Sequence, residues 1–292
     1  MTTPRTGSTD AGSALYVFAV CRDADPSAVA AVPGFEGGET VRTLSFGPLT
    51  AVVQTVPAAD FTDEVWQARL GDRGELERYA RAHHDVVTAV AASAPTVPLP
   101  MATLYHGEDS ALTALADRAA GFERVLARVA HHAEWGVKVY VPASPVPEPE
   151  AETEPEPAPE AAAAPARSAA AVGSGPAGRT PPAPGAGLAY LNRRRGVQRR
   201  RERHQVEAGR AADTVDAAFR EVAVEARRLR LHDAQDTADR RVHVLNATYL
   251  VADERAAELA HLARSLRESS GAEVVLSGPW VPYSFVGEGV DA

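Results

Sequence analysis

A stretch rich in proline, alanine and glutamate, residues 142–187, limits how the rest of the chain can fold. It contains the run PVPEPEAETEPEPAPEAAAAPA, which has almost no large apolar side chains. Such a composition buries too little apolar surface to offset the entropy lost on ordering, so the segment is predicted to be disordered, with polyproline II character. The folded parts must therefore be built from the residues on either side of it.

Strands and helices are predicted in the part of the chain before this stretch. Residues 15–20 (LYVFAV) and 50–56 (TAVVQTV) are short, β-branched runs typical of buried strands. Apolar residues recur at helical spacing over residues 72–93 and again from Ser110, a suitable N-cap, to His132 in the last turn. The first part of the chain is thus a mixture of strands and helices.

The second part begins with a strand over residues 137–141, which Gly136 separates from the preceding helix. After the proline-rich stretch, a long helix is predicted, with an apolar face that runs from Val215 to Leu229. A strand (243–251), a helix capped by Asp253 and a last strand (273–280) follow. This order is the skeleton of a ferredoxin-like α+β sandwich with one strand not found.

These elements predict an α+β protein of two domains, each long enough to hold a core of its own. Residues 1–12 are expected to be a disordered tail and residues 13–132 an N-terminal α+β domain. Residues 133–292 would form the C-terminal, ferredoxin-like domain, and the disordered stretch 142–187 would be an insertion in its first strand-to-helix connection.

Charge and composition exclude several classes of protein. The net charge of −9 and the pI near 5.5 argue against overall attraction to nucleic acid or to an anionic membrane. No apolar run has the length of a membrane span, and the N-terminal residues lack the apolar region of a secretion signal. The single Cys21 cannot form an intramolecular disulfide and is expected to be buried. A cytoplasmic protein without a lipid-membrane partner is therefore expected.

No motif in the sequence indicates catalysis. The nucleophile elbow, the paired-cysteine and HExxH zinc motifs and the phosphate-binding P-loop are absent, and the glycine pattern of residues 173–178 lies in low-complexity sequence. His83 and His84 are adjacent, so on a helix they point about 100° apart and cannot both bind one ion. We expect no enzyme, cofactor, metal or small-molecule substrate; a metal hydrolase that uses His83 and Asp85 is a remote alternative.

An arginine run at residues 193–203 is the strongest local concentration of charge. A helix that carries it could neutralise several phosphates, so a nucleic-acid-binding protein is the alternative function. The run has no interleaved aromatic residues, however, and six glutamates between Glu148 and Glu160 could pair with it. A solvated helix or a protein-docking surface is preferred, with Arg193, Arg194 and Arg195 as possible partner-binding or domain-interface residues.

The final segment, SGPWVPYSF (residues 277–285), gathers aromatic residues in a chain that is only 6% aromatic. Its prolines stiffen the backbone and so hold Trp280, Tyr283 and Phe285 in fixed directions. A catalytic lid is excluded because no chemistry lies beneath it. We expect the segment to seal the second domain or its contact with the first, and direct contact with a partner is the alternative.

The order of these segments resembles that of the gas vesicle protein family GvpF/GvpL. The matching segments are LYVFAV, HHDVV, PLPMATLYHGED, WGVKVYV, GLAYLNRRR, NATYLV and SGPWVPYSF. The last is the most specific, with Ser277 and Val281 as mild departures. MATLYHGED departs more, because relatives usually have an arginine-phenylalanine-glycine pattern there.

The resemblance implies a non-enzymatic accessory or minor structural protein of gas vesicles in the cytoplasm. Its members have two α+β domains, the second a modified ferredoxin-like fold, and no established catalytic residues or cofactor. They are thought to bind the small hydrophobic shell protein and to limit its aggregation while vesicles nucleate and assemble. The expected partners are the shell protein and other gas vesicle proteins, and no nucleic acid is expected.

Overall fold

The structure is a computed structural model that describes residues 12–143, 186–231 and 241–287. The side chains of residues 186–191 and of Arg193 also lie outside the description. The predicted tail (1–12) and insertion (142–187) fall almost wholly outside the described residues. Among the helices of the described residues, none has the length and apolarity needed to cross a membrane.

The first domain is built on an antiparallel sheet with strand order β2-β3-β1-β4, and β5 also pairs with β1. Its strands are β1 (Ser13–Cys21), β2 (Arg42–Phe46), β3 (Leu49–Pro57), β4 (Thr96–Pro98) and β5 (Leu104–Tyr105). Its helices are α1 (Pro26–Ala30), α2 (Asp63–Gly71), α3 (Arg73–Ala91), α4 (Glu108–Asp117) and α5 (Ala119–Val129).

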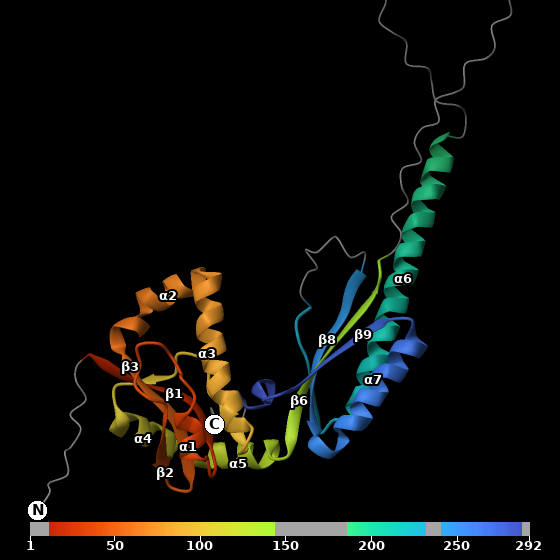
Figure 1. The fold of residues 1–292 in the computed structure, drawn as a ribbon. Helices are drawn as coiled ribbons and strands as arrows, with labels where there is room; N and C mark the ends of the chain where they lie inside the picture. Colours follow the sequence, from red (N-terminus) through yellow and green to blue (C-terminus); the bar gives the residue numbers. More distant parts are fainter. Residues whose placement is uncertain (1–11, 144–185, 232–240, 288–292) are drawn as a thin grey trace, which may run out of the picture.

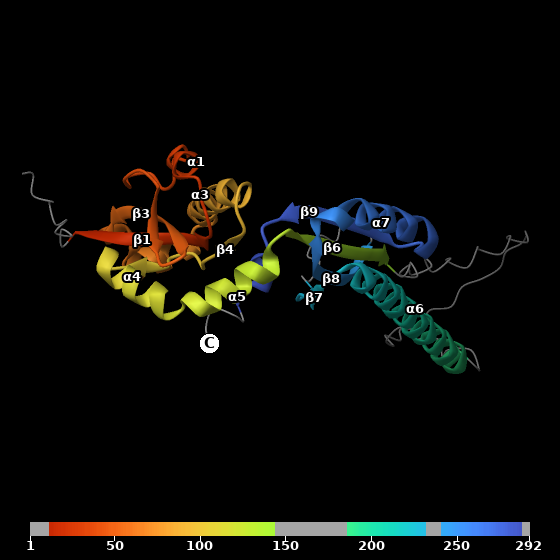
Figure 2. The same cartoon turned by 90° about the horizontal axis from the view of Figure 1, so that it is seen from below.

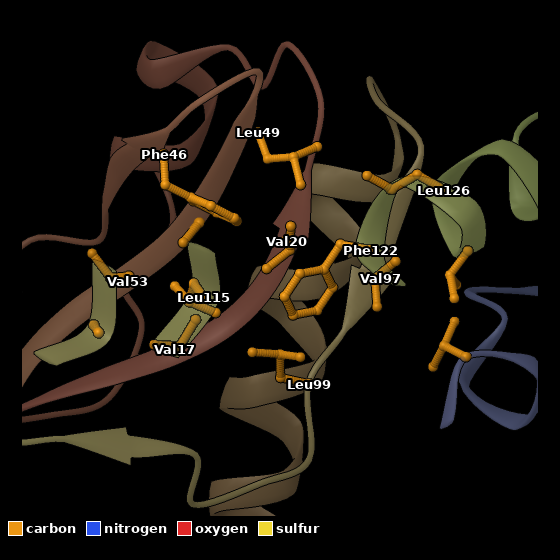
Figure 3. Packing of buried hydrophobic residues seen from close by; sticks show 14 of the residues in the cluster. Val17, Val20, Phe46, Leu49, Val53, Val97, Leu99, Leu115, Phe122 and Leu126 are labelled. Carbon is orange, nitrogen blue, oxygen red and sulfur yellow. The ribbon is translucent and has the colours of Figure 1, made fainter. Parts of the chain in front are cut away.

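Helices cover both faces of this sheet: α1 and α3 lie on one side, α4 and α5 on the other (Figure 2). Side chains alternate along β1, so Leu15 and Val17 enter the α4/α5 core while Tyr16 and Phe18 enter the α3 core. Figure 3 shows Val17 of β1 in the α4/α5 core with Leu115 and Phe122. Because β1 is buried on both faces, its sequence is a continuous apolar run.

Several helix boundaries differ from the sequence prediction. The helix expected from Ser110 to His132 is two helices, and the first begins at Glu108 after the N-cap Gly107. His131 and His132 are not in a last helical turn: His131 has a positive φ of 60°, and His132 opens the next strand. Gly136 does not separate helix from strand, because that strand already includes it.

The second domain contains an antiparallel sheet of order β7-β8-β6-β9, with α6 and α7 packed on one face (Figure 1). Its elements are β6 (His132–Pro142), α6 (Ala186–Val222), β7 (Glu225–Arg228), β8 (Arg241–Ala252), α7 (Ala256–Ser270) and β9 (Glu273–Trp280). The predictions of two α+β domains and of a ferredoxin-like second domain are confirmed. The predicted insertion falls between β6 and α6.

The strand that the sequence analysis did not find is β7. Ala226 and Leu229, predicted on a helix face, lie in β7 and just after it, because α6 ends at Val222. Two backbone bonds draw the chain onto β8: the Val224 amide donates to the Leu250 carbonyl (2.9 Å), and the Leu229 amide donates to a β8 carbonyl at 2.7 Å. The strand is thus defined by its pairing rather than by its own side chains.

A carboxylate from α6 ties β7 and β8 to the helix. Asp216 is 4% exposed and accepts hydrogen bonds from the Tyr249 hydroxyl (2.6 Å), Arg220 Nε (3.0 Å) and Arg228 Nε (2.9 Å). Burial acts to raise the pKa of Asp216, but these bonds to its charged form outweigh it, so the pKa is lowered. The paired carboxylate fixes the short strand against the helix.

In the first domain, His83 of α3 is buried, 3% exposed, beside Tyr16 of β1. The Tyr16 hydroxyl lies 2.9 Å from His83 Nδ1 and accepts the Ala102 amide at 3.1 Å. Burial and, to a smaller extent, the neighbouring His84 together lower the pKa of His83 to about 4, because both disfavour the imidazolium. The folded domain therefore holds a neutral imidazole.

This buried histidine predicts a loss of stability in mild acid. Between pH 6.5 and about 4, His83 binds a proton in the unfolded chain but stays neutral in the folded protein. The free energy of unfolding therefore falls by up to about 3 kcal/mol as the pH is lowered through this range. His83→Gln keeps an acceptor for Tyr16 but does not titrate. Denaturant unfolding across this pH range should give a shallower pH dependence for the variant, and parallel curves would contradict the prediction.

Candidate functional site

The C-terminal segment, residues 278–286, consists of the end of β9 and the stretch that crosses back to the first domain. Val281 joins the α3 core of that domain and Val286 joins the α4/α5 core. Gly278 begins the crossing with a cis bond to Pro279 and a φ of +128°. A Cβ atom there would lie 2.9 Å from the Glu134 carbonyl oxygen, so both conformation and space require glycine.

Polar contacts anchor the segment where the two domains meet. The Glu134 carboxylate of β6 accepts hydrogen bonds from the Ser284 amide (2.9 Å) and hydroxyl (2.6 Å). Arg128 of α5 donates to the Phe285 carbonyl and lies 3.6 Å from the Glu225 carboxylate of β7. One short turn, η4 (Tyr283–Phe285), is therefore bonded to elements of both domains.

The three aromatic residues of the segment have different environments. Phe285 is fully buried, and the Arg227 guanidinium lies 5.6 Å from its ring centre. Trp280 is 49% exposed and Tyr283 is 38% exposed, and both rings lie about 6 Å from that of His84. The Tyr283 hydroxyl lies 3.5 Å from His84 Nδ1, and partial burial raises the pKa of Tyr283.

A cleft of about 500 Å³ lies between the domains beside these exposed rings. One wall is the end of α3 and the loop to β4, including His84 and Thr88; the other is Pro279 to Pro282 of the C-terminal segment. His131 and Asp253 line it too, so its surface mixes apolar and polar groups. Trp280, whose ring is half exposed, is among the residues that line the cleft.

The predicted arginine residues do not join this site. Arg194 and Arg195 are exposed on the N-terminal half of α6, which projects away from the C-terminal segment (Figure 1). Arg193 lies on the same helix, with its side chain outside the description. A partner-binding or interface role for these three arginines stays a prediction.

The positions of His83 and Asp85 do not favour the remote metal-hydrolase alternative. His83 is buried against Tyr16, and Asp85 is exposed on the next stretch of the same helix. Within the described ranges, no group of three or more His, Cys, Asp or Glu side chains is placed to hold a metal ion.

Sequence reasoning did not find the residues that receive the C-terminal segment. Glu134 and Arg128 make long-range contacts, 150 and 157 residues away in the chain. No local pattern marks either residue, because a lone glutamate in a strand or an arginine on a helix is usually solvated. The nearest signal is the placement of Val281 and Val286 among turn-forming residues after the last strand.

Comparison with known proteins identifies the family to which this two-domain chain belongs. Residues 14–287 match the family model described as gas vesicle synthesis protein GvpL/GvpF. The chain belongs to the GvpL/GvpF family. Gas vesicle protein L of Streptomyces sp. (strain CB03234) is 34% identical over 272 residues, which cover 93% of this chain and 92% of that protein. The resemblance seen in the sequence is thus confirmed, and a gas vesicle-related role follows for this GvpL/GvpF chain.

Solved structures support the GvpL/GvpF fold. The crystal structure of GvpF from Anabaena sp. PCC7120 superposes with a TM-score of 0.61 at 12% identity, covering 94% of this chain and 96% of that one. GvpF from Microcystis aeruginosa gives 0.57 at 13% identity, covering 94% and 99%. At this identity the likeness concerns the fold, which is shared across nearly the full length.

The different environments of Phe285 and Trp280 predict different effects on stability. Phe285→Ala empties a fully buried position between the domains and should cost roughly 3–5 kcal/mol. Trp280→Ala removes a half-exposed ring and should cost less than about 1 kcal/mol. Thermal unfolding of the two variants beside wild type measures this difference, and a midpoint for Phe285→Ala near that of wild type would contradict it.

Proposed function

We propose that this GvpL/GvpF protein is an accessory or minor structural protein of gas vesicles that binds the hydrophobic shell protein. In this role it limits aggregation of shell subunits while vesicles nucleate and assemble in the cytoplasm, without catalysis. Family membership supports the assignment to gas vesicles. Neither the family description nor the name of the Streptomyces relative mentions the shell protein, so binding to that partner is part of the proposal.

The observation that carries the proposal is the exposed indole of Trp280 on the rim of the interdomain cleft. A shell subunit must present apolar surface to gas in the finished vesicle, so before assembly it needs a partner that covers this surface. Tryptophan and tyrosine are the side chains most often found at the energetic centre of such interfaces. The acidic remainder of the chain, with a net charge of −9, would keep the complex in solution.

The C-terminal segment gives this surface a rigid base. Val281, Phe285 and Val286 are buried, whereas Trp280 and Tyr283 keep exposed rings on the same short stretch of backbone. A ring held in place loses little entropy when it is covered, which favours binding. The segment thus combines the two roles that the sequence left as alternatives, with the seal and the docking surface on different residues.

Trp280→Ala is expected to weaken co-purification of the protein with its shell protein, by about tenfold or more in apparent affinity. The thermal midpoint should stay close to that of wild type. Leu70→Ala on α2 is the matched control, because Leu70 is an apolar residue of similar exposure, 46%, outside the cleft. This control should bind the shell protein as wild type does.

Two results would overturn the proposal. If the Trp280→Ala variant bound the shell protein with wild-type affinity, the docking surface would not be at this site. Normal vesicle formation in a strain that lacks the only copy of the gene would remove the assembly role itself.

A further inference from the structure

The N-terminal half of α6 receives no support from the second-domain core. The first residue of the helix that is buried in the described part is Ala212, followed by Val215, Phe219 and Val222. Figure 1 shows the earlier turns projecting beyond the sheet. Most of the stability of a helix in a protein comes from packing, so these turns depend on other contacts.

Charge makes this half of α6 less stable still. Six arginines are exposed there, and Glu202 is the single acidic residue among them; they are Arg194, Arg195, Arg199, Arg200, Arg201 and Arg203. None of the six has an ion-pair partner within the described residues. Arg195, Arg199 and Arg203 follow one another at four-residue spacing, where like charges destabilise a helix. Anionic groups from elsewhere would relieve this repulsion.

The chain itself carries such groups close by. The Pro142 carbonyl, at the end of β6, accepts a hydrogen bond from His204 Nε2 of α6 at 2.7 Å. Six glutamates follow at positions 148, 150, 152, 154, 156 and 160, and the first is within about 20 Å of extended chain from Pro142. Arg200 and Arg201 lie only about 4.5 to 6 Å along the helix axis from His204. The glutamates are therefore tethered within reach of the arginines.

The two sides of the helix are not equivalent. With 3.6 residues per turn, Arg194 and Arg201 fall on the same side as Ala212, Val215 and Phe219, which pack against the sheet. Arg195, Arg199 and Arg203 fall on the opposite side. The chain leaves β6 at Pro142, which contacts His204. Arg200 and Arg201 lie within one turn of His204, and Arg194 shares the side of Arg201.

We infer that the basic face of α6 formed by Arg194, Arg200 and Arg201 binds the glutamates of residues 148–160 of the same chain. Each exposed ion pair is weak and is screened by salt. The tether compensates for this, because it holds the glutamates at an effective concentration in the millimolar range. The contact stabilises the projecting turns and keeps their arginines from binding nucleic acid.

Hydrogen exchange of full-length protein tests the contact. Replacement of the six glutamates by glutamine should speed exchange of the amides of residues 194–203 about tenfold, and high salt should do the same to wild type. Replacement by aspartate keeps every charge and is the matched control, expected to exchange as wild type does. Equal exchange in wild type and the glutamine variant, or equal acceleration in the aspartate variant, would overturn the inference.

Heparin retention gives a second measurement that is independent of helix stability. The glutamine variant should elute at higher salt than wild type, because its arginines are uncovered. Adding Arg194→Gln, Arg200→Gln and Arg201→Gln should abolish the gain. The same substitutions at Arg195, Arg199 and Arg203 remove equal charge from the opposite side and should abolish less of it. Wild-type retention as strong as that of the glutamine variant would mean that the arginines are free for an external polyanion.

Discussion

The contact of Glu134 with Ser284 holds η4 (Tyr283–Phe285) where the two domains meet. Both carboxylate oxygens of Glu134 are used, one by the backbone amide and one by the hydroxyl of the same serine. Because the carboxylate is 6% exposed, its charge is tolerated only with such partners. The position of Phe285, the burial of Val281 and Val286 and the walls of the cleft all depend on this turn staying in place.

The environments of the residues in this segment explain why aromatic and proline residues are concentrated at residues 277–285. Residues that face the domains are buried and make the two-domain arrangement specific. Residues one or two positions away keep exposed rings against His84 and the cleft. Alternation along a stiff backbone thus separates a structural role from the proposed binding role within a few residues. In the GvpL/GvpF family context, this gives an apolar surface that does not require the domains to open.

Sequence reasoning predicted those parts of the fold whose own side chains define them. The runs at residues 15–20 and 50–56 became β1 and β3, and the last predicted strand (273–280) became β9. It failed where distant residues decide. The sequence of β7, EARR, favours a helix, and only pairing with β8 makes it a strand. Likewise, Trp280 and Phe285 are both large aromatic residues, and only their contacts with distant parts of the chain leave one exposed and bury the other.

The two cores of the first domain also bear on how the protein is made. Each contains residues from the beginning of the chain, such as Tyr16 and Val17, and one from its end, Val281 or Val286. Domains generally fold in order as they leave the ribosome. Here the first domain cannot complete either core until residues 281–286, on the far side of the second domain in sequence, have left the exit tunnel. Its part of the nascent chain must therefore stay incompletely packed while the second domain is being translated.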